Sequence, residues 1–163
     1  MTISKADRYT EISRYLLEEA QQQLDRGDLI QASEKTWGAA AHAIKSLAQT
    51  RGWNHTRHDL LADVVEQISD EWGRTDLATL FNSAESMHHN FYGHPRSSRY
   101  VQGSINDVTT LIEELHALRL QPPQPFSPET REQQARLRKL TRRPPPDEDD
   151  VSDLPPVRPV PPA

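Results

Sequence analysis

Proline is distributed so unevenly along this 163-residue chain that it divides the chain in two. Twelve of the 13 prolines lie from Pro122 onward, and only Pro95 precedes that point. Proline lacks a backbone N–H and breaks the interior of a helix, so long helices are open to residues 1–121 and not to residues 122–163. We therefore expect one folded domain at 1–121 and a Pro-rich tail at 122–163.

Composition excludes several classes of protein. The mean hydropathy is -0.81, and no apolar run approaches the roughly 20 residues that a membrane span needs, so we expect no membrane association. The N-terminus lacks the apolar core of a signal peptide. The chain has no cysteine, which excludes disulfides and thiolate chemistry and is typical of the reducing cytoplasm. These features predict a cytoplasmic protein.

The hydrophobic pattern of residues 1–121 is helical throughout. Apolar side chains recur every three or four residues in five segments, near residues 4–26, 28–51, 56–72, 75–92 and 100–120. No segment alternates with a period of two, as a half-buried strand would. Short connections favour antiparallel neighbours, so we expect an all-α fold, an up-and-down antiparallel bundle of four main helices plus a shorter one. Ser4 and Asp28 are the expected N-caps of the first two helices.

The tail consists of three chemically different segments. Ser127-Pro128-Glu129 is a typical helix start, so we expect a short basic helix over 128–141. An acidic run from Asp147 to Asp153 follows, and the chain ends in a polyproline sequence. We expect this ending to be disordered or polyproline II, either solvated or docked on an aromatic groove of a protein partner.

Charge argues against electrostatic binding of nucleic acid by the domain. Residues 1–121 carry 12 Lys and Arg against 17 Asp and Glu, while residues 122–163 carry 7 of each. A domain that binds nucleic acid through bulk charge is basic, and this one is acidic. The tail is neutral only because its separate basic and acidic blocks cancel, a pattern typical of interaction tails.

Histidines supply most of the candidate chemistry. His88 and His89 lie in the sequence Met-His-His-Asn-Phe-Tyr at the end of the fourth predicted helix. Imidazole can act as an acid or a base near pH 7, and together with Asn90 and Tyr92 this group could hold a phosphate or a base. His88 lies at the edge of the apolar stripe, where partial burial is the ordinary role, whereas His89 should point into solvent or a groove.

A metal site is a second interpretation of the same histidines. His55 and His58, near the start of the third predicted helix, could meet His88 and His89, and four imidazoles would suit zinc or iron. Two Glu-x-x-His pairs resemble those of di-iron bundles, but Glu113 projects about 100° from the apolar line of its helix. We therefore expect no metal ligands and no cofactor, with a metal-binding bundle as an alternative.

The second predicted helix carries two unusual stripes. Small residues lie nearly all round it and permit close approach of another backbone; they are Gly38, Ala39, Ala40, Ala41 and Ala43. Away from Trp37, which lies on the core line, Lys35, His42 and Lys45 form a basic stripe. These stripes suggest a dimer face or a groove for an anionic ligand, against ordinary solvent exposure as the alternative.

Several of these motifs together resemble a known family. The run from Gly27 to Lys45, followed by Arg51-Gly-Trp53, His58 and Met-His-His-Asn-Phe-Tyr92, is similar to the PaREP family of archaeal repeat-associated proteins, which is itself similar to HEPN domains. The resemblance covers roughly residues 5–120 and not the tail. It implies an all-α bundle, commonly dimeric, in a group of toxin–antitoxin components, metal-independent ribonucleases and non-catalytic nucleotide or RNA binders.

The resemblance does not extend to a catalytic motif. Catalytic HEPN proteins carry an arginine a few positions before a histidine, often followed by x-Tyr. His88 or His89 can stand for that histidine and Tyr92 for the tyrosine, but Ala84 and Glu85 stand where the arginine would be. The cation that would stabilise a phosphorane-like transition state is therefore missing from its place.

We therefore expect a HEPN-like, non-catalytic binding protein, a homodimer linked to toxin–antitoxin, nucleotide or RNA-related systems. The alternative is a metal-independent ribonuclease or nucleotide-binding toxin that uses His88, His89 and Tyr92. The expected binding residues are Lys35, Trp37, His42, Lys45, His58, His89, Asn90 and Tyr92.

Overall fold

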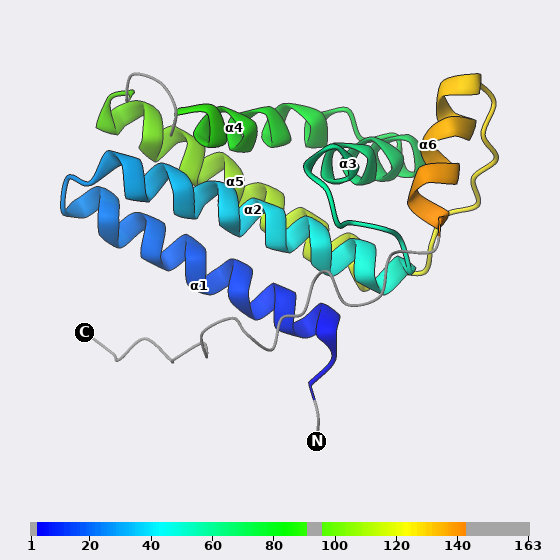
Figure 1. The fold of residues 1–163 in the computed structure, drawn as a ribbon, viewed down its shortest axis with the longest axis horizontal. Helices are drawn as coiled ribbons and strands as arrows, with labels where there is room; N and C mark the ends of the chain where they lie inside the picture. Colours follow the sequence, from blue (N-terminus) through cyan, green and yellow to red (C-terminus); the bar gives the residue numbers. More distant parts are fainter. Residues whose placement is uncertain (1–2, 91–95, 143–163) are drawn as a thin grey trace.

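The computed structural model describes residues 3–90 and 96–142, and these residues form an all-α bundle with no strand among them (Figure 1). The all-α prediction is confirmed, with a further helix in the segment assigned to the tail. The helices are α1 (Lys5–Asp25), α2 (Leu29–Arg51), α3 (His58–Trp72), α4 (Asp76–Asn90), α5 (Ser98–Arg119) and α6 (Arg131–Thr141). The predicted polyproline ending and Tyr92 lie outside the described residues.

Helix ends follow the local chemistry that the sequence indicates. The Ser4 hydroxyl accepts a hydrogen bond from the backbone N–H three residues on at 3.1 Å, and the Asp28 carboxylate does the same at 3.0 Å, so both predicted N-caps are confirmed. Helices α2 and α3 end at Gly52 and Gly73, whose φ angles of 69° and 63° are left-handed. Glycine adopts that conformation without the steric cost of a Cβ.

Helix α2 is the central element of the bundle, because it contacts α1, α3, α4 and α5. Figure 1 shows α1 on one side of α2, α3 and α4 following each other along the other side, and α5 behind. Three helices are long, with 21, 23 and 22 residues, and α3 and α4 have 15 residues each. The largest fully buried side chains are Tyr9, Ile44, Leu47, Leu60, Ile68, Leu77, Met87, Leu111, Leu115 and Leu140.

The small residues of α2 are covered within the chain. The Ser13 hydroxyl of α1 donates to the Ala39 carbonyl oxygen at 2.6 Å, and Ala39 is fully buried. A Cβ added at Gly38 would lie 3.2 Å from the Cδ1 atom of Leu16, so α1 already approaches as closely as glycine permits. The dimer face suggested by this stripe is thus occupied by α1, and the predicted homodimer would need a different surface.

Helix α6 begins three residues later than the helix predicted over 128–141. Thr130 is its N-cap: the hydroxyl accepts from the Gln133 N–H at 3.1 Å, and the Gln133 side-chain oxygen accepts from the Thr130 N–H at 3.2 Å. This reciprocal capping box satisfies two backbone donors that the helix itself cannot. The predicted start at Ser127-Pro128 offers no such pair, which explains the difference.

Helix α6 packs against α3. Leu140 is fully buried in the main core, and its carbonyl oxygen accepts a hydrogen bond from the Asn54 N–H at 2.7 Å. Arg136 is buried as well, and its guanidinium donates to the Gln67 side-chain oxygen at 3.1 and 3.0 Å. The sequence predicts a basic helix here but not its docking, because the anchor is a buried arginine whose hydrogen bonds are satisfied rather than an apolar stripe. The domain boundary after residue 121 remains a prediction.

Replacing Leu140 by alanine tests the contribution of α6 to the core. We expect Leu140→Ala to lower the free energy of unfolding by about 2–5 kcal/mol, since it leaves a cavity beneath α6. Urea denaturation measures this change. Leu120→Ala is the control, because Leu120 is 66% exposed and its truncation should change stability by about 0.5 kcal/mol or less.

Two truncated chains extend the same test. A chain ending at residue 142 should keep the stability of the full chain. A chain ending at residue 121 should still fold, because α1 to α5 retain most of the core, but should unfold at lower urea concentration. If the two truncated chains unfold at the same urea concentration and Leu140→Ala does not change stability, α6 adds nothing to the core.

Candidate functional site

Three aromatic rings from three helices meet at one side of α2. Trp37 of α2 stacks on His58 of α3, with ring centroids 4.7 Å apart and an angle of 19° between the planes. His88 of α4 lies 5.0 Å from Trp37 and 5.1 Å from His58. We call Trp37, His58 and His88 the ring cluster. The sequence indicates that His58 and His88 could meet, and the fold places Trp37 beside both of them.

The ring cluster is anchored on its inner side and open on its outer side. Trp37 is half-buried and its ring lies 6.1 Å from that of Phe81, a buried core residue. His88 is half-buried, whereas His58 is exposed. His89 is also exposed, and its ring lies 5.8 Å from the ring of His88. The core thus holds Trp37 in place while two imidazoles remain accessible to a ligand.

The surroundings of His88 favour its uncharged form. Burial lowers the pKa of His88 below its usual value, and the neighbouring His58 and His89 lower it further, whereas Glu85 opposes them. His88 is therefore uncharged at pH 7. No lysine or arginine occurs anywhere in α4, and Arg57, next to His58, is paired with a carboxylate at 2.9 Å. The site suits a flat ring with hydrogen-bonding edges better than a bare anion.

The predicted basic stripe of α2 does not join the ring cluster. The Lys35 ammonium lies 3.9 Å from a carboxylate oxygen of Glu19 on α1. The His42 ring lies 5.9 Å from that of Tyr9, also on α1, and its Nδ1 is 2.7 Å from the carbonyl oxygen one turn before. Lys45 lies eight residues beyond Trp37, about 12 Å along the helix axis. These side chains therefore do not form a single anion groove with Trp37.

Two other predicted binding residues are at the limit of what the structure describes. Asn90 is the last residue of α4, and Tyr92 lies outside the described residues. The predicted group at the end of α4 is therefore represented by its two histidines alone.

The four histidines considered as an alternative metal site converge only in part: His58, His88 and His89 lie together, and His55 does not join them. His55 is buried beside α1: its ring meets the Tyr9 ring edge-on at 5.5 Å, and its Nε2 lies 3.0 Å from the side-chain oxygen of Gln49. Within residues 3–90 and 96–142, no group of three or more His, Asp or Glu side chains is arranged to hold a metal ion. The His58 imidazole stacks on Trp37 and is not part of a metal-ligand group.

The fold and the ring cluster together define an all-α bundle protein with an open aromatic and imidazole site. The chain belongs to the archaeal PaREP1/PaREP8 family, whose model matches residues 8–112. The resemblance to that family seen in the sequence is therefore confirmed. None of the helices in the described part of the chain is long and apolar enough to cross a membrane.

A solved structure has a similar fold. It is the crystal structure of a protein from Sulfolobus solfataricus, with 24% sequence identity and a TM-score of 0.59, and the match covers 74% of this chain and 100% of that one. At this identity the likeness concerns the fold alone. No curated protein matches the chain.

The lowered pKa of His88 predicts a pH dependence of stability. The folded chain binds this proton less readily than the unfolded chain, whose histidines titrate near 6.5. His116 acts in the same direction, because burial and the nearby Arg14 and Arg119 lower its pKa. The free energy of unfolding should thus be greatest above pH 6.5 and fall as the pH drops through the two folded-state pKa values.

Urea denaturation at about pH 7.5 and about pH 5 measures this loss, in a range above the titration of carboxylates. A His88→Gln/His116→Gln variant should lose less stability on acidification than the unaltered chain. An unchanged pH dependence in the double variant would assign the effect to other groups.

Proposed function

We propose that this protein is a non-catalytic, HEPN-like binding protein that acts as a homodimer and takes its ligand at the ring cluster. The observation that supports this function is the Trp37–His58 stack, anchored in the core and open to solvent at His58. In the group that the sequence resembles, such bundles are linked to toxin–antitoxin, nucleotide and RNA-related systems.

A nucleotide or an unpaired RNA base is the ligand that fits this chemistry. Every base has a flat π-face that can extend a stack of aromatic side chains. The exposed imidazoles of His58 and His89 offer donors and acceptors to the edge of the base. Unpaired bases are also the usual target of specific RNA recognition, because their edges are free.

The residues around His89 favour binding without catalysis. Ala84, one turn before His88, is fully buried and cannot contribute charge. Glu85 adds a negative charge where a phosphoryl transition state would need a positive one. The missing cation therefore supports a site that binds a ligand and leaves it unchanged.

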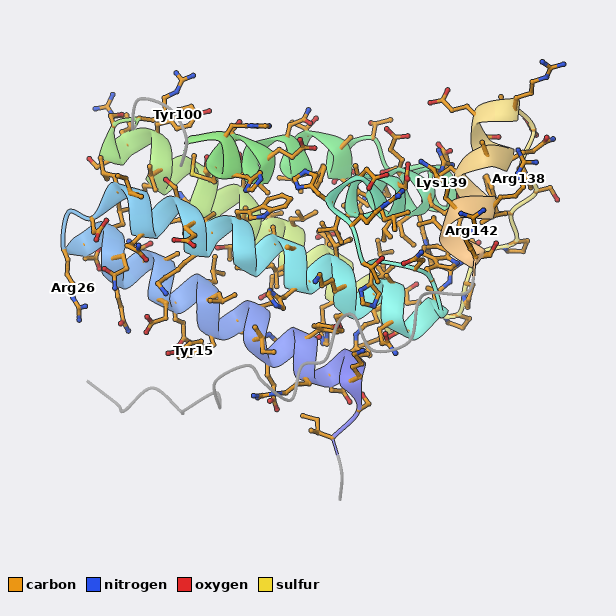
Figure 2. All side chains as sticks on the ribbon, viewed as in Figure 1. Tyr15, Arg26, Tyr100, Arg138, Lys139 and Arg142 are labelled. Atoms are coloured by element: carbon orange, nitrogen blue, oxygen red, sulfur yellow. The ribbon has the colours of Figure 1, made fainter. Side chains whose placement is uncertain are left out.

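Replacing His58 tests the ligand site. We expect the full chain to bind ATP or a short single-stranded RNA, and His58→Ala to weaken binding about fivefold or more, since stacking contributes about 1–3 kcal/mol per base. Trp37 fluorescence quenching, with Trp53 and Trp72 replaced by phenylalanine, reports the binding. Tyr15→Ala is the matched control, because Tyr15 is an aromatic residue on the outer side of α1, away from α3 and α4 (Figure 2). Equal binding by His58→Ala would contradict the proposal.

The same probe RNA separates binding from cleavage. Incubation of the full chain with RNA in EDTA should leave the RNA intact, because the catalytic arginine is missing. Cleavage that disappears in His89→Ala would instead support the metal-independent ribonuclease that the sequence leaves as an alternative.

Sedimentation tests the homodimer separately. We expect a dimer at tens of micromolar protein, formed through a surface other than the small-residue stripe of α2. Because the ring cluster is built within one chain, His58→Ala should leave the dimer intact. A monomer at this concentration would remove the dimer from the proposal and leave the ligand site standing.

A further inference from the structure

We propose that Arg136 is a positioning residue for the ring cluster, which it controls from the far side of α3. By holding α6 against α3, Arg136 fixes where α3 begins and so holds His58 on Trp37. The inference rests on the proposed function only in treating the ring cluster as a ligand site. The partners of Arg136 are Glu66, Gln67 and Asp70, not the three rings of the cluster.

The start of α3 lacks a side-chain cap of its own. His58 is the first residue of α3, and Arg57 at the N-cap position makes no side-chain capping hydrogen bond. Such a bond normally stabilises a helix start by satisfying a backbone donor that the helix itself cannot. The placement of His58 therefore depends on what holds the connection between α2 and α3 and on what holds α3 itself.

Helix α6 holds that connection. The Asn54 N–H donates to the carbonyl oxygen of Leu140 at 2.7 Å. The side-chain oxygen of Asn54 accepts from the Thr56 N–H at 3.2 Å and from its hydroxyl at 3.0 Å. Asn54 therefore joins α6 on one side to the turn immediately before His58 on the other.

Helix α6 also clamps the body of α3. The Arg136 guanidinium donates to the Gln67 oxygen and, at 2.5 Å, to an Asp70 carboxylate oxygen. One turn on, the Lys139 ammonium lies 2.6 Å from Asp63. A buried guanidinium is costly unless it is paired, so α6 is stable on this face of α3 only while Arg136 keeps these partners.

The clamp and His58 lie on different sides of α3. With about 100° of rotation per residue, the face formed by Asp63, Gln67 and Asp70 lies about 120° to 180° around the helix from His58. Helix α3 is thus held between α6 on one side and Trp37 on the other. A shift of α3 toward the place vacated by α6 would carry His58 away from Trp37.

The neighbouring arginine provides a matched control. Arg138 lies two residues from Arg136 in the same helix, but its side chain is exposed and points away from the bundle (Figure 2). It makes no ion pair within the described residues. Replacing either arginine by glutamine removes the same charge, and only Arg136→Gln removes the clamp.

The test measures the His58 ring directly in the full chain. Trp37 stacked on His58 should shift the ring proton signals of His58 by its ring current, and these signals are assigned by their loss in His58→Ala. We expect Arg136→Gln to abolish that shift and to weaken binding of ATP or single-stranded RNA several-fold. Arg138→Gln should change neither. Exchange of the Asn54 amide hydrogen reports whether α6 has left.

The outcomes are distinct. If the Asn54 amide exchanges rapidly in Arg136→Gln while the His58 shift is retained, α6 has left without moving His58 and the inference is overturned. If Arg136→Gln does not fold, the double variant Gln133→Ala/Lys139→Ala loosens α6 by removing its contacts with Asp70 and Asp63 and is judged by the same two signals. Because the His58 shift needs no ligand, failure of the probes to bind would contradict the proposed function and leave the positioning role intact.

Discussion

Helix α2 touches four other helices, and the size of its side chains decides how near each of them can come. Along its middle it presents glycine and alanine, and α1 comes close enough for Ser13 to bond the backbone of Ala39. Because side chains in a protein interior interdigitate at the density of organic crystals, two helices packed this closely cannot slide along each other. Trp37 is the large side chain that directly precedes this stretch of small residues. Helix α1 packs closely on the small residues, and the Trp37 ring lies against His58 of α3 and His88 of α4.

The ring cluster follows from where three helices begin or pass. His58 is the first residue of α3, His88 is in the last turn of α4, and Trp37 lies in the first half of α2. Helices α3 and α4 both pack on α2. The rings of His58, at the start of α3, and His88, near the end of α4, meet beside Trp37, and the outer edge of this ring cluster is accessible at His58. An uncharged His88 imidazole next to the Trp37 indole makes that edge polar without adding charge. Under the proposed function, such a site would distinguish ligands by shape and edge chemistry rather than by net charge.

Local patterns predicted the helices well, because caps and apolar periodicity act over a few residues. Ser4, Asp28, Gly52 and Gly73 begin or end helices where the sequence indicates. Contacts between distant segments were harder to predict. The small-residue stripe of α2 indicated a close neighbour but could not indicate whether that neighbour was α1 or a second chain. Individual histidines stood out, yet only the fold shows that His58 and His88 share Trp37 while His55 belongs to Tyr9. The apolar pattern did not predict the docking of α6 on α3, because the residue that anchors α6 is the charged Arg136.

A charged anchor has a consequence for how precisely α6 is placed. A short helix held by a few apolar contacts can shift by a turn and recover most of them. The fork of Arg136 meets the amide oxygen of Gln67 and the carboxylates of Asp70 and Glu66, and those acceptors match it in one register only. A slip by one turn would leave a buried cation unpaired. The anchor thus provides specificity of alignment more than strength, and it fixes the position of α6, up to Arg142, on the bundle.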